Sequence, residues 1–427
     1  MKTVIIAPTS LDGKIKVPPS KSISHRAIIG AALAKGKACV NNLLLSEDIK
    51  ATIEGMKALG ASINLEDDTC ISIQGIKETG IQIPTIDCKE SGSTLRFLIP
   101  VANVIKTPAT FTGEGRLGKR PLTPYYDIFS RQNIDYETTH GQLPLKVTGS
   151  LKPDDYYIAG DISSQFITGL LYALPLLDGD STIHITTELE SKGYIDLTLD
   201  VLKHYSIQIH HENYKTFKIK GNQSYVSQDY TVEGDYSQAA FWIVAGLIDN
   251  GLTIEGMRLD SGQGDRMILD IVKQMGGKIV EEEHAIHILP SVTHGIEIDA
   301  SQCPDLVPVL SVLAAVSKGT TKIINAARLR IKESDRLAST TSELNKLGAE
   351  IIEDADSLTI HGKDHLKGGI VDSWNDHRIA MALAVASIRC TDQVKITNSD
   401  TVKKSYPTFW EDFKKLGGEI DEFDLGK

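Results

Sequence analysis

The stretch SKSISHRAIIGAALA, residues 20–34, joins a polar segment directly to an apolar one. Its first seven residues hold three serines, a lysine, a histidine and an arginine, and the next eight are apolar or small. A helix that is apolar on every side is expected to be buried. Its N-terminus still presents unpaired N–H groups and the positive end of the helix dipole. The stretch therefore predicts either an ordinary capped helix start or an anion-binding site.

The same pattern recurs along the chain at a nearly constant interval. Five further polar segments precede apolar runs: ESGSTLRFLIPVA from residue 90, DISSQFITGLLYALPLL from 161, GDYSQAAFWIVAGLI from 234, CPDLVPVLSVLAAV from 303 and NDHRIAMALAVAS from 375. Equivalent positions in the six segments are 70, 72, 74, 68 and 70 residues apart: Lys21, Ser91, Ser163, Ser237, Asp305 and Asn375. The chain is therefore predicted to contain six repeats of about 70 residues, each a small α/β module.

A second series of segments keeps the same interval. IEGMKALGASINL, VLKHYSIQIHH, IVKQMGGKIVEEE and ELNKLGAEIIED each fit an amphipathic helix, a turn and a strand, and YYDIFSRQNIDYE and FWEDFKKLGGEID fit more loosely. Gly276, Gly348 and Gly417 follow such helices at 72 and 69 residues, where a helix end favours a left-handed residue. Each repeat is thus expected to hold a buried helix, an exposed amphipathic helix and several strands.

Composition excludes several classes of protein. The 45 lysines and arginines against 56 aspartates and glutamates give a net charge of -11, which argues against a nucleic-acid or membrane-surface binder. The five cysteines are scattered without a C-x-x-C pair, so we expect a reducing compartment, no disulfide framework and no metal site. The N-terminal apolar run VIIA is too short for a signal peptide, and no stretch approaches the ~20 apolar residues of a membrane span. A soluble, cytoplasmic protein is expected.

Anion-binding side chains gather at the starts of the apolar helices, against this acidic background. The candidates are Lys21, Ser22 and Arg26 in the first repeat, Ser91, Gly92, Ser93 and Arg96 in the second, Ser163, Ser164 and Gln165 in the third, and His377 and Arg378 in the sixth. Lys403 and Lys404 lie in a loop before Pro407. Asp305, at the fifth helix start, is a candidate general acid or base among these cations. The implied ligand is small and carries several negative charges.

Two basic segments need separate interpretation. GEGRLGKRPLTP, residues 113–124, matches G-x-G-x-x-G, but Arg120 stands where a P-loop needs Ser or Thr, and Pro121 prevents a helix before Leu122. The segment therefore favours a mobile anion clamp over a nucleotide site. RLRIKESDRL, residues 328–337, is typical of a solvated, salt-bridged helix start, although its Glu333 is also a candidate for proton transfer.

Eight motifs together resemble one enzyme family. SKSISHR, ESGSTLR, GKRP, ISSQF, SKGYID, RIKESDR, NDHR and KKSYPTF, in this order, are similar to the 5-enolpyruvylshikimate-3-phosphate synthases, which are enolpyruvyl transferases, over residues 14–413. The resemblance implies an α/β (α+β) fold of two similar globular domains, each of three βαβαββ repeats with buried helices, an inside-out α/β barrel. It places repeats 1–3 in an N-terminal domain of residues 14–233 and repeats 4–6 in a C-terminal domain of residues 1–13 and 234–427. The active site is implied to lie in the cleft between the domains.

The resemblance also assigns ligands. It implies that shikimate 3-phosphate is bound by Lys21, Ser22, Arg26, Ser163, Ser164, Gln165, Ser191, Asp305, Arg328 and Lys332. It implies that phosphoenolpyruvate is bound by Lys21, Gly92, Arg120, Gln165, Arg336, Arg378 and Lys404. The implied catalytic residues are Asp305 as proton acceptor, Glu333 as a partner in proton transfer, and Lys21. No metal, no organic cofactor and no macromolecular partner are implied, and a monomer is expected.

The implied reaction is an addition followed by an elimination. The 5-hydroxyl of shikimate 3-phosphate adds to C2 of the enolpyruvyl group while C3 gains a proton, and the tetrahedral intermediate then loses phosphate and a methyl proton. Such chemistry needs carboxylates to move protons, cations to hold the anions and closure to exclude water. The product would serve chorismate and aromatic amino acid synthesis.

Three positions bear on this assignment. Glu90-Ser91-Gly92-Ser93-Thr94 stands where many members have Gly-Asn-Ala-Gly-Thr, and Arg328 stands where many have asparagine. The alternative is the sister enzyme UDP-N-acetylglucosamine 1-carboxyvinyltransferase, whose mobile loop carries a cysteine at the position of Gly115. The glycine and the SKSISHR motif favour the phosphoshikimate enzyme.

Overall fold

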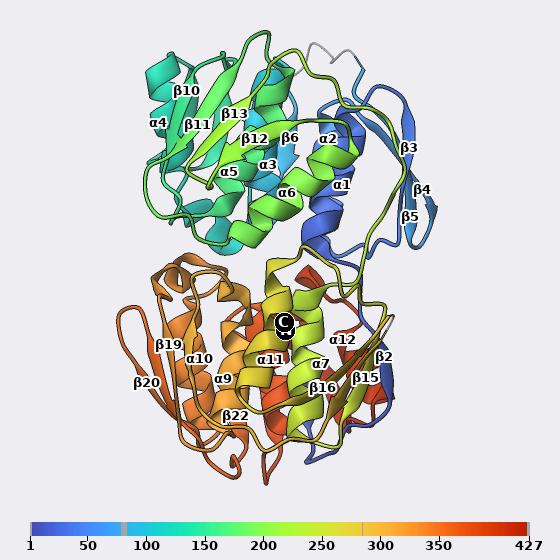
Figure 1. Ribbon diagram of the computed structural model, residues 1–427, viewed down its shortest axis with the longest axis vertical. Coiled ribbons are helices and arrows are strands. Elements are labelled where there is room, and N and C mark those ends of the chain that lie inside the picture. The colour runs from blue at the N-terminus through green and yellow to red at the C-terminus, as the bar shows by residue number, and fades with distance from the viewer. Residues whose placement is uncertain (1, 78–82, 284, 425–427) are drawn as a thin grey trace. The chain divides into compact units, whose positions relative to one another are not determined.

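The computed structural model describes residues 2–77, 83–283 and 285–424 of the 427-residue chain. The described chain divides into two compact units (Figure 1). Unit 1 holds the chain up to Ser20 and from Glu233 onward, and unit 2 holds Lys21–Val232. Each unit has its own hydrophobic core, because the buried apolar residues form one cluster within each.

Unit 2 contains three repeats, and each builds one four-stranded sheet. In the second and third repeats the first and second strands are parallel and joined by a helix, whereas the third and fourth form a hairpin whose last strand pairs antiparallel with the second. In the first repeat the parallel strand comes from the end of the unit. The strands and long helices are β3 (Lys37–Asn41), β4 (Ser62–Asp67), β5 (Cys70–Gln74), β6 (Thr85–Asp87), β7 (Ala109–Thr112), β8 (Tyr136–Thr139), β9 (Gln142–Val147), β10 (Asp155–Ile158), β11 (Ser181–Ile185), β12 (Ile209–Glu212), β13 (Thr216–Ile219), β14 (Tyr230–Thr231), α1 (Lys21–Leu33), α2 (Glu47–Ala58), α3 (Gly92–Val104), α4 (Thr123–Gln132), α5 (Ser164–Ala173) and α6 (Lys192–His204). The short helices are η1 (Gly115–Lys119) and η2 (Leu174–Leu176).

Unit 1 repeats the same architecture in the other half of the chain. Its strands and long helices are β1 (Lys2–Ile6), β2 (Lys14–Lys16), β15 (Leu252–Glu255), β16 (Lys278–Glu282), β17 (Ala285–Leu289), β18 (Glu297–Asp299), β19 (Thr320–Ile324), β20 (Glu350–Glu353), β21 (Leu358–His361), β22 (Gly369–Asp372), β23 (Val394–Thr397), β24 (Ile420–Asp424), α7 (Tyr236–Ile248), α8 (Met267–Gln274), α9 (Val307–Ala315), α10 (Arg336–Lys346), α11 (His377–Ser387) and α12 (Phe409–Lys415). The short helices are η3 (Gly264–Arg266), η4 (Pro304–Leu306), η5 (Ala327–Ile331) and η6 (Ser399–Lys404). Six βαβαββ repeats therefore account for the described residues, which confirms the predicted repeat and fold class.

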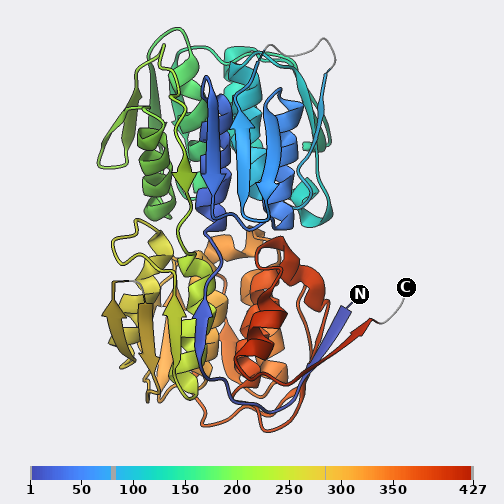
Figure 2. The same cartoon turned by 90° about the vertical axis from the view of Figure 1, so that its right-hand side faces the viewer.

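Three sheets are completed by strands from distant parts of the chain. β14 pairs parallel with β3, β2 pairs parallel with β15, and β1 lies between β23 and β24. Figure 2 shows β1 and β24 side by side. Because β2 belongs to the sheet of the fourth repeat, the boundary between the units lies after residue 20 rather than after residue 13, where the resemblance places it.

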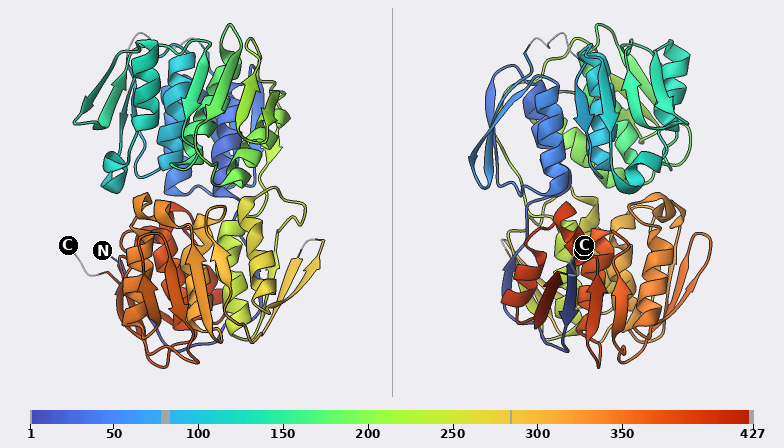
Figure 3. Two further views of the ribbon diagram at one scale, coloured as in Figure 1. Left: turned by 60° about the vertical axis from the view of Figure 1, so that its left-hand side comes forward. Right: turned by 180° about the vertical axis from the view of Figure 1, so that it is seen from behind.

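The first helix of each repeat is buried, as its apolar sequence predicts. Every residue of α7, α9 and α11 is buried, and α1, α3 and α5 are almost as enclosed. The views in Figure 3 show the strands of each unit flanking these helices. The second helices are amphipathic: α2 and α6, for example, bury one face and expose charged residues on the other. The buried helices thus leave only their ends accessible, and the candidate ligands lie at their N-terminal ends.

The turns after the second helices follow the predicted glycine pattern. Gly276, Gly348 and Gly417 have φ values of 93°, 88° and 106°, the left-handed region in which glycine is free of strain. Among the described residues, no helix combines the length and the apolar character that a membrane span requires.

Candidate active site

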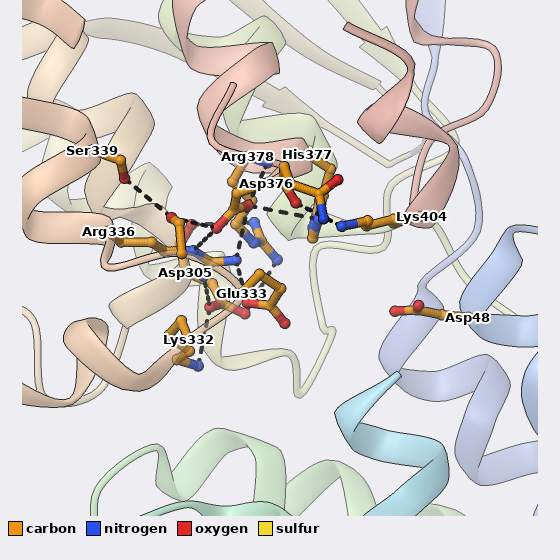
Figure 4. Close-up of polar contacts among 12 residues, drawn as sticks. Asp48, Asp305, Lys332, Glu333, Arg336, Ser339, Asp376, His377, Arg378 and Lys404 are labelled. Atoms are coloured by element: carbon orange, nitrogen blue, oxygen red, sulfur yellow. Dashed lines mark hydrogen bonds and ion pairs between the residues drawn. The ribbon is translucent and has the colours of Figure 1, made fainter. Parts of the chain in front are cut away.

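The fifth repeat places a carboxylate at the start of its buried helix. Asp305 lies in η4, directly before α9, and its side chain is 16% exposed. Its Oδ1 accepts hydrogen bonds from Arg336 Nη1 at 2.7 Å and Lys332 Nζ at 3.3 Å. Its Oδ2 accepts one from Arg378 Nη2 at 3.2 Å. The structure therefore brings the candidate acid–base group together with cations from two other motifs (Figure 4).

Arg336, the first residue of α10, contacts three carboxylates. Besides Asp305, its Nη2 donates to Glu333 Oε2 at 2.8 Å, and its Nε donates to Asp376 Oδ2 at 2.8 Å (Figure 4). The Arg336 side chain is 1% exposed and that of Asp376 is fully buried. Burial opposes the charge, yet these three carboxylates raise the pKa of Arg336 above its ordinary value. The Arg336 guanidinium therefore stays charged. A bound anion would contact the N–H groups that the three carboxylates leave unused, together with the neighbouring cations.

Asp376 makes two kinds of contact in this arrangement. It is the N-cap of α11 and accepts the backbone N–H of Arg378 at 2.9 Å, as the NDHR sequence suggests. It also holds Arg336, which lies 40 residues earlier in the chain. Burial disfavours its charge, but Arg336 and then His377 hold the pKa of Asp376 below its ordinary value. No spacing in the sequence indicates this ion pair, because it depends on how α10 packs beside α11.

The segment RLRIKESDRL divides into an outer and an inner part. Arg330 forms ion pairs with Asp335 and Glu353 at the surface, which matches the solvated helix start expected of this charge run. Lys332, Glu333 and Arg336 instead lie around Asp305 or Arg336. Arg330 of this segment thus forms surface ion pairs, whereas Lys332, Glu333 and Arg336 form part of a candidate binding surface.

Two further cations of this group lie in defined environments. Burial lowers the pKa of Lys332 to about 8, although the charge of Asp305 partly opposes the shift. Arg328 is buried in η5, and its Nη2 donates to the Ser301 carbonyl at 2.8 Å. Arg328 therefore has a fixed position, and its contact with a substrate stays a prediction.

Lys404 lies at the end of η6. Its Nζ donates to the backbone carbonyl of Asn375 at 2.6 Å, next to the N-cap of α11. The predicted cations of the sixth repeat, Arg378 and Lys404, therefore both lie at the start of α11 (Figure 4).

Unit 2 contains a second group of predicted residues, centred on the start of α1. Lys21 Nζ lies 2.8 Å from Asp48 Oδ2, in the first turn of α2, a partner that the sequence did not indicate. Arg26 is buried and donates to the hydroxyl of Thr198 and to the carbonyls of Ser22 and Tyr194. These three acceptors carry no full charge, so the guanidinium keeps its attraction for an anion. Burial lowers the pKa of Arg26 from its ordinary value.

The starts of α3 and α5 meet in the same unit. Arg96 Nη1 donates to Gln165 Oε1 at 2.7 Å, and Gln165 Nε2 donates to Ser93 Oγ at 3.0 Å. A Cβ at Gly92 would lie 2.8 Å from Arg96 Nη1, 3.0 Å from Arg120 Nη1 and 3.2 Å from Gln165 Oε1. Only glycine lets these polar groups approach the backbone so closely. The structure thus brings together Gly92, Arg120 and Gln165, and adds Arg96.

The loop of residues 113–122 is not a nucleotide-binding loop. Residues Gly115–Lys119 form η1, and α4 begins only at Thr123, as Pro121 predicts. Arg116 and Lys119 are exposed, whereas Arg120 is half-buried beside Gly92. The structure therefore places Arg120 against another predicted site residue.

Two of the predicted serine ligands, Ser163 and Ser191, occupy helix N-cap positions. Ser163 is the N-cap of α5 and its Oγ accepts the Gln165 N–H at 3.3 Å, while Ser164 is the first residue of that helix. Ser191, with φ 55°, is the N-cap residue of α6. Capping alone explains Ser163, so its contact with a ligand stays a prediction.

A buried hydrogen-bond chain lies behind the start of α1. His25 Nδ1 is 2.7 Å from Thr52 Oγ1, which is 2.7 Å from Thr94 Oγ1. Thr94 in turn donates to Ser91 Oγ, the N-cap of α3, at 2.8 Å. These hydrogen bonds tie α1 and α2 to α3, and of the residues involved only Ser91 was a candidate from the sequence.

His25 should make the stability of the protein fall in acid. Burial, reinforced by the charges of Lys21 and Arg26, lowers the pKa of His25 well below 6.5. The unfolded chain gains a proton below pH 6.5 that the folded chain does not, so stability is present above that pH and is lost as the pH falls below it. In urea unfolding at pH 7.5 and 5.5, the wild type should lose about 1 kcal/mol more than His25→Asn. Equal losses would contradict a neutral His25.

The two units carry groups of residues with different chemistries. Unit 1 offers a carboxylate among cations, which suits proton transfer beside an anion. Unit 2 offers cations, hydroxyls, an amide and exposed helix N-termini, which suit phosphate or carboxylate binding.

Comparison with known proteins agrees with this chemistry. The family model described as EPSP synthase (3-phosphoshikimate 1-carboxyvinyltransferase) matches residues 5–413. The 3-phosphoshikimate 1-carboxyvinyltransferases of Clostridium kluyveri and Clostridium novyi are 57% and 55% identical, each over the whole of both chains. The solved EPSP synthase of Acinetobacter baumannii is 27% identical with a TM-score of 0.83, over 99% of this chain and 100% of that one. The chain therefore belongs to the EPSP synthase (3-phosphoshikimate 1-carboxyvinyltransferase) family.

Proposed function

We infer that the protein transfers the enolpyruvyl group of phosphoenolpyruvate to the 5-hydroxyl of shikimate 3-phosphate and releases phosphate. The reaction belongs to the shikimate pathway and leads toward chorismate and the aromatic amino acids. The observation that carries this function is the family match from residue 5 to residue 413, which contains every predicted site residue. The protein is thus a transferase whose substrates are both small, phosphorylated anions.

We propose that shikimate 3-phosphate is held through its phosphate by the start of α1. Arg26 supports this because it is buried and bound only to neutral acceptors among its described partners. Lys21 and Ser22 lie in the first turn of the same helix. Further donors come from Ser163, Ser164, Gln165 and Ser191. The ring hydroxyls are assigned to Asp305, Lys332 and Arg328.

Phosphoenolpyruvate is assigned to two groups of residues. In unit 2 these are Lys21, Gly92, Arg120 and Gln165, and the close approach at Gly92 supports their joint use. In unit 1 they are Arg336, Arg378 and Lys404, whose positions are fixed by Asp305, Asp376 and the Asn375 carbonyl. Both units therefore contribute residues to the same two substrates in this proposal.

Asp305 is the proposed base that takes the proton of the attacking 5-hydroxyl. It lies among Lys332, Arg336 and Arg378, so charge that develops on the substrates meets cations already in place. Glu333 is the proposed partner that moves a proton at the methyl carbon, and Lys21 the cation that acts on the leaving phosphate. Asp305 and Glu333 are two carboxylates on different N–H groups of Arg336, which suits a reaction with two proton transfers.

The deciding experiment is the release of inorganic phosphate from phosphoenolpyruvate by the purified protein. Release should require shikimate 3-phosphate. The alternative acceptor, UDP-N-acetylglucosamine, should give none, because the exposed Gly115 of η1 supplies no reactive thiol. Release that depends on the UDP sugar would overturn the assignment.

Gly92→Ala should weaken phosphoenolpyruvate binding selectively. The added Cβ would displace Arg96 and Arg120, which lie 2.8 and 3.0 Å from its position. We expect the KM for phosphoenolpyruvate to rise about tenfold, equivalent to about 1.4 kcal/mol, with a smaller change for shikimate 3-phosphate. Gly118→Ala is the matched control, since a Cβ there meets nothing within 4 Å. Equal changes in both KM values would remove the special position of Gly92.

We also propose that the enzyme acts in the cytoplasm as a monomer. The five cysteines are all unpaired, and two of them, Cys39 and Cys70, are partly exposed thiols, which suits a reducing compartment. Sedimentation of the purified protein at active concentrations tests the monomer, and a mass of twice 46.6 kDa would contradict it.

A further inference from the structure

The loop between β22 and α11 has an uncommon backbone. Trp374 and Asn375 are successive non-glycine residues with φ of 52° and 55°. The left-handed region crowds Cβ against the backbone, and a bulky residue such as tryptophan seldom occupies it. Contacts around the loop must therefore hold this conformation.

Glu343, in α10, supplies such contacts. Its side chain is fully buried. Glu343 Oε1 accepts a hydrogen bond from Trp374 Nε1 at 2.8 Å, and Oε2 accepts one from the Asp372 N–H at 2.9 Å. Lys346 and Ser342 bind the same carboxylate from within α10. Burial opposes the charge, but these donors lower the pKa of Glu343, so it remains a carboxylate.

The residues directly after Trp374 bind two of the cations assigned to phosphoenolpyruvate and cap the helix that carries the third. The Asn375 carbonyl accepts Lys404 Nζ at 2.6 Å. Asp376 accepts Arg336 Nε at 2.8 Å, and it also accepts the backbone N–H of Arg378 at 2.9 Å as the N-cap of α11. A change in the backbone at residues 374–375 would therefore disturb the contacts of Lys404 and Arg336 and the helix start at Arg378.

We propose that Glu343 and Trp374 are positioning residues for enolpyruvyl transfer, because their hydrogen bond fixes the left-handed loop that sets Lys404, Arg336 and Arg378. Neither residue touches the substrates in this proposal. The proposal rests on the proposed function only for the identity of the anion that Lys404, Arg336 and Arg378 bind. Its structural part concerns the loop alone and can be measured without a substrate.

The first test uses Trp374→Phe, which deletes the indole N–H and keeps an aromatic ring, and Glu343→Gln, which keeps the size of the side chain. We expect the KM for phosphoenolpyruvate to rise about tenfold in both variants, with a fall in kcat of a few fold. The KM for shikimate 3-phosphate should stay within about twofold of the wild-type value. This separation distinguishes positioning from a general loss of folded protein.

Two control variants separate the loop contact from stability. Lys346→Met removes a donor to Glu343 from within α10 but leaves both loop hydrogen bonds. Trp242→Phe removes an indole N–H bonded to Tyr406 in the core of the same unit. Both should lower the unfolding midpoint and leave both KM values within about twofold of wild type. A selective rise in the phosphoenolpyruvate KM in either control would overturn the proposal.

The second test measures amide hydrogen exchange at residues 374–378 of the substrate-free protein. Exchange should be at least several fold faster in Trp374→Phe and Glu343→Gln than in the wild type or Lys346→Met, because the loop opens more often without the hydrogen bond between Glu343 and Trp374. Unchanged exchange, or an unchanged phosphoenolpyruvate KM in an active Trp374→Phe enzyme, would overturn the proposal. If the wild type is inactive but exchange is fast in the two variants, the proposed function is overturned, whereas the role of the Glu343–Trp374 hydrogen bond in holding the loop is supported.

Discussion

Asp305→Ala should lose about three orders of magnitude in turnover and still bind both substrates. A general base contributes on the order of 10² to 10⁴ to the rate, and Asp305 is the carboxylate that the structure surrounds with Lys332, Arg336 and Arg378. Binding survives because most of the proposed ligands are other residues. Phosphate release at saturating substrates measures turnover, and calorimetric titration with shikimate 3-phosphate measures binding.

The variant should also stay folded, which makes the test decisive. Arg336 keeps Glu333 and Asp376 as partners when Asp305 is removed. Asp270→Ala, on the exposed side of α8 in the same unit, is the control and should retain wild-type turnover. Turnover above about a tenth of the wild-type value in Asp305→Ala would exclude Asp305 as the base.

The repeat and its buried helices could be predicted because they depend on local composition. α7 and α9 contain no charged residue and are mostly apolar, and the structure buries every residue of each. Glycine takes the left-handed position after four of the six second helices, whereas Asn133 and Ser206 take it after α4 and α6. The change from a polar segment to an apolar helix repeats six times, so one period accounts for the described chain.

The pairing of strands from distant parts of the chain could not be predicted from the residues alone. β14 has two residues and β2 has three, too few for an alternating pattern. The resemblance placed residues 1–13 with the C-terminal half, but it gave no sign that β2 pairs with β15. Partners in a parallel pair are chosen by the tertiary fold, and here they are more than 230 residues apart, as Lys14 and Thr253 show.

Site residues were predictable where a helix start concentrates polar groups, and not where a buried ion pair joins two helices. Lys21, Arg26 and Arg378 stand at such starts and were found from the sequence. The carboxylates that hold the cations, Asp48 and Asp376, were not found as partners, since they lie 27 and 40 residues from the residues they bind. The sequence therefore indicates which groups bind anions better than it indicates what keeps those groups in place.

Arg336→Leu should be the most destabilising change in unit 1, and its effect should depend on pH. The substitution leaves Asp376 buried without the guanidinium that lowers its pKa, next to Glu333 and Asp305. Removing one partner of a buried ion pair costs about 3–5 kcal/mol, so the free energy of unfolding at pH 8 should fall by that amount. Turnover should be lost as well, because the variant lacks a proposed phosphoenolpyruvate ligand.

The pH dependence separates this mechanism from a simple packing defect. In the wild type the lowered pKa of Asp376 stabilises the fold above pH 3.8, and this contribution is lost as the pH falls through the folded-state pKa. Without Arg336, burial raises the pKa of Asp376, so the variant binds a proton on folding. Its loss of unfolding free energy relative to the wild type should therefore shrink between pH 8 and pH 5, by about 1 kcal/mol or more, which corresponds to about one pKa unit.

Arg330→Leu is the matched control: Arg330 also pairs with two carboxylates, but its side chain is 30% exposed. Urea unfolding should show a loss of about 1 kcal/mol for Arg330→Leu, with wild-type turnover, because exposed pairs contribute little. A deficit in Arg336→Leu that is the same at both pH values would mean that the cost lies in packing rather than in the stranded carboxylates.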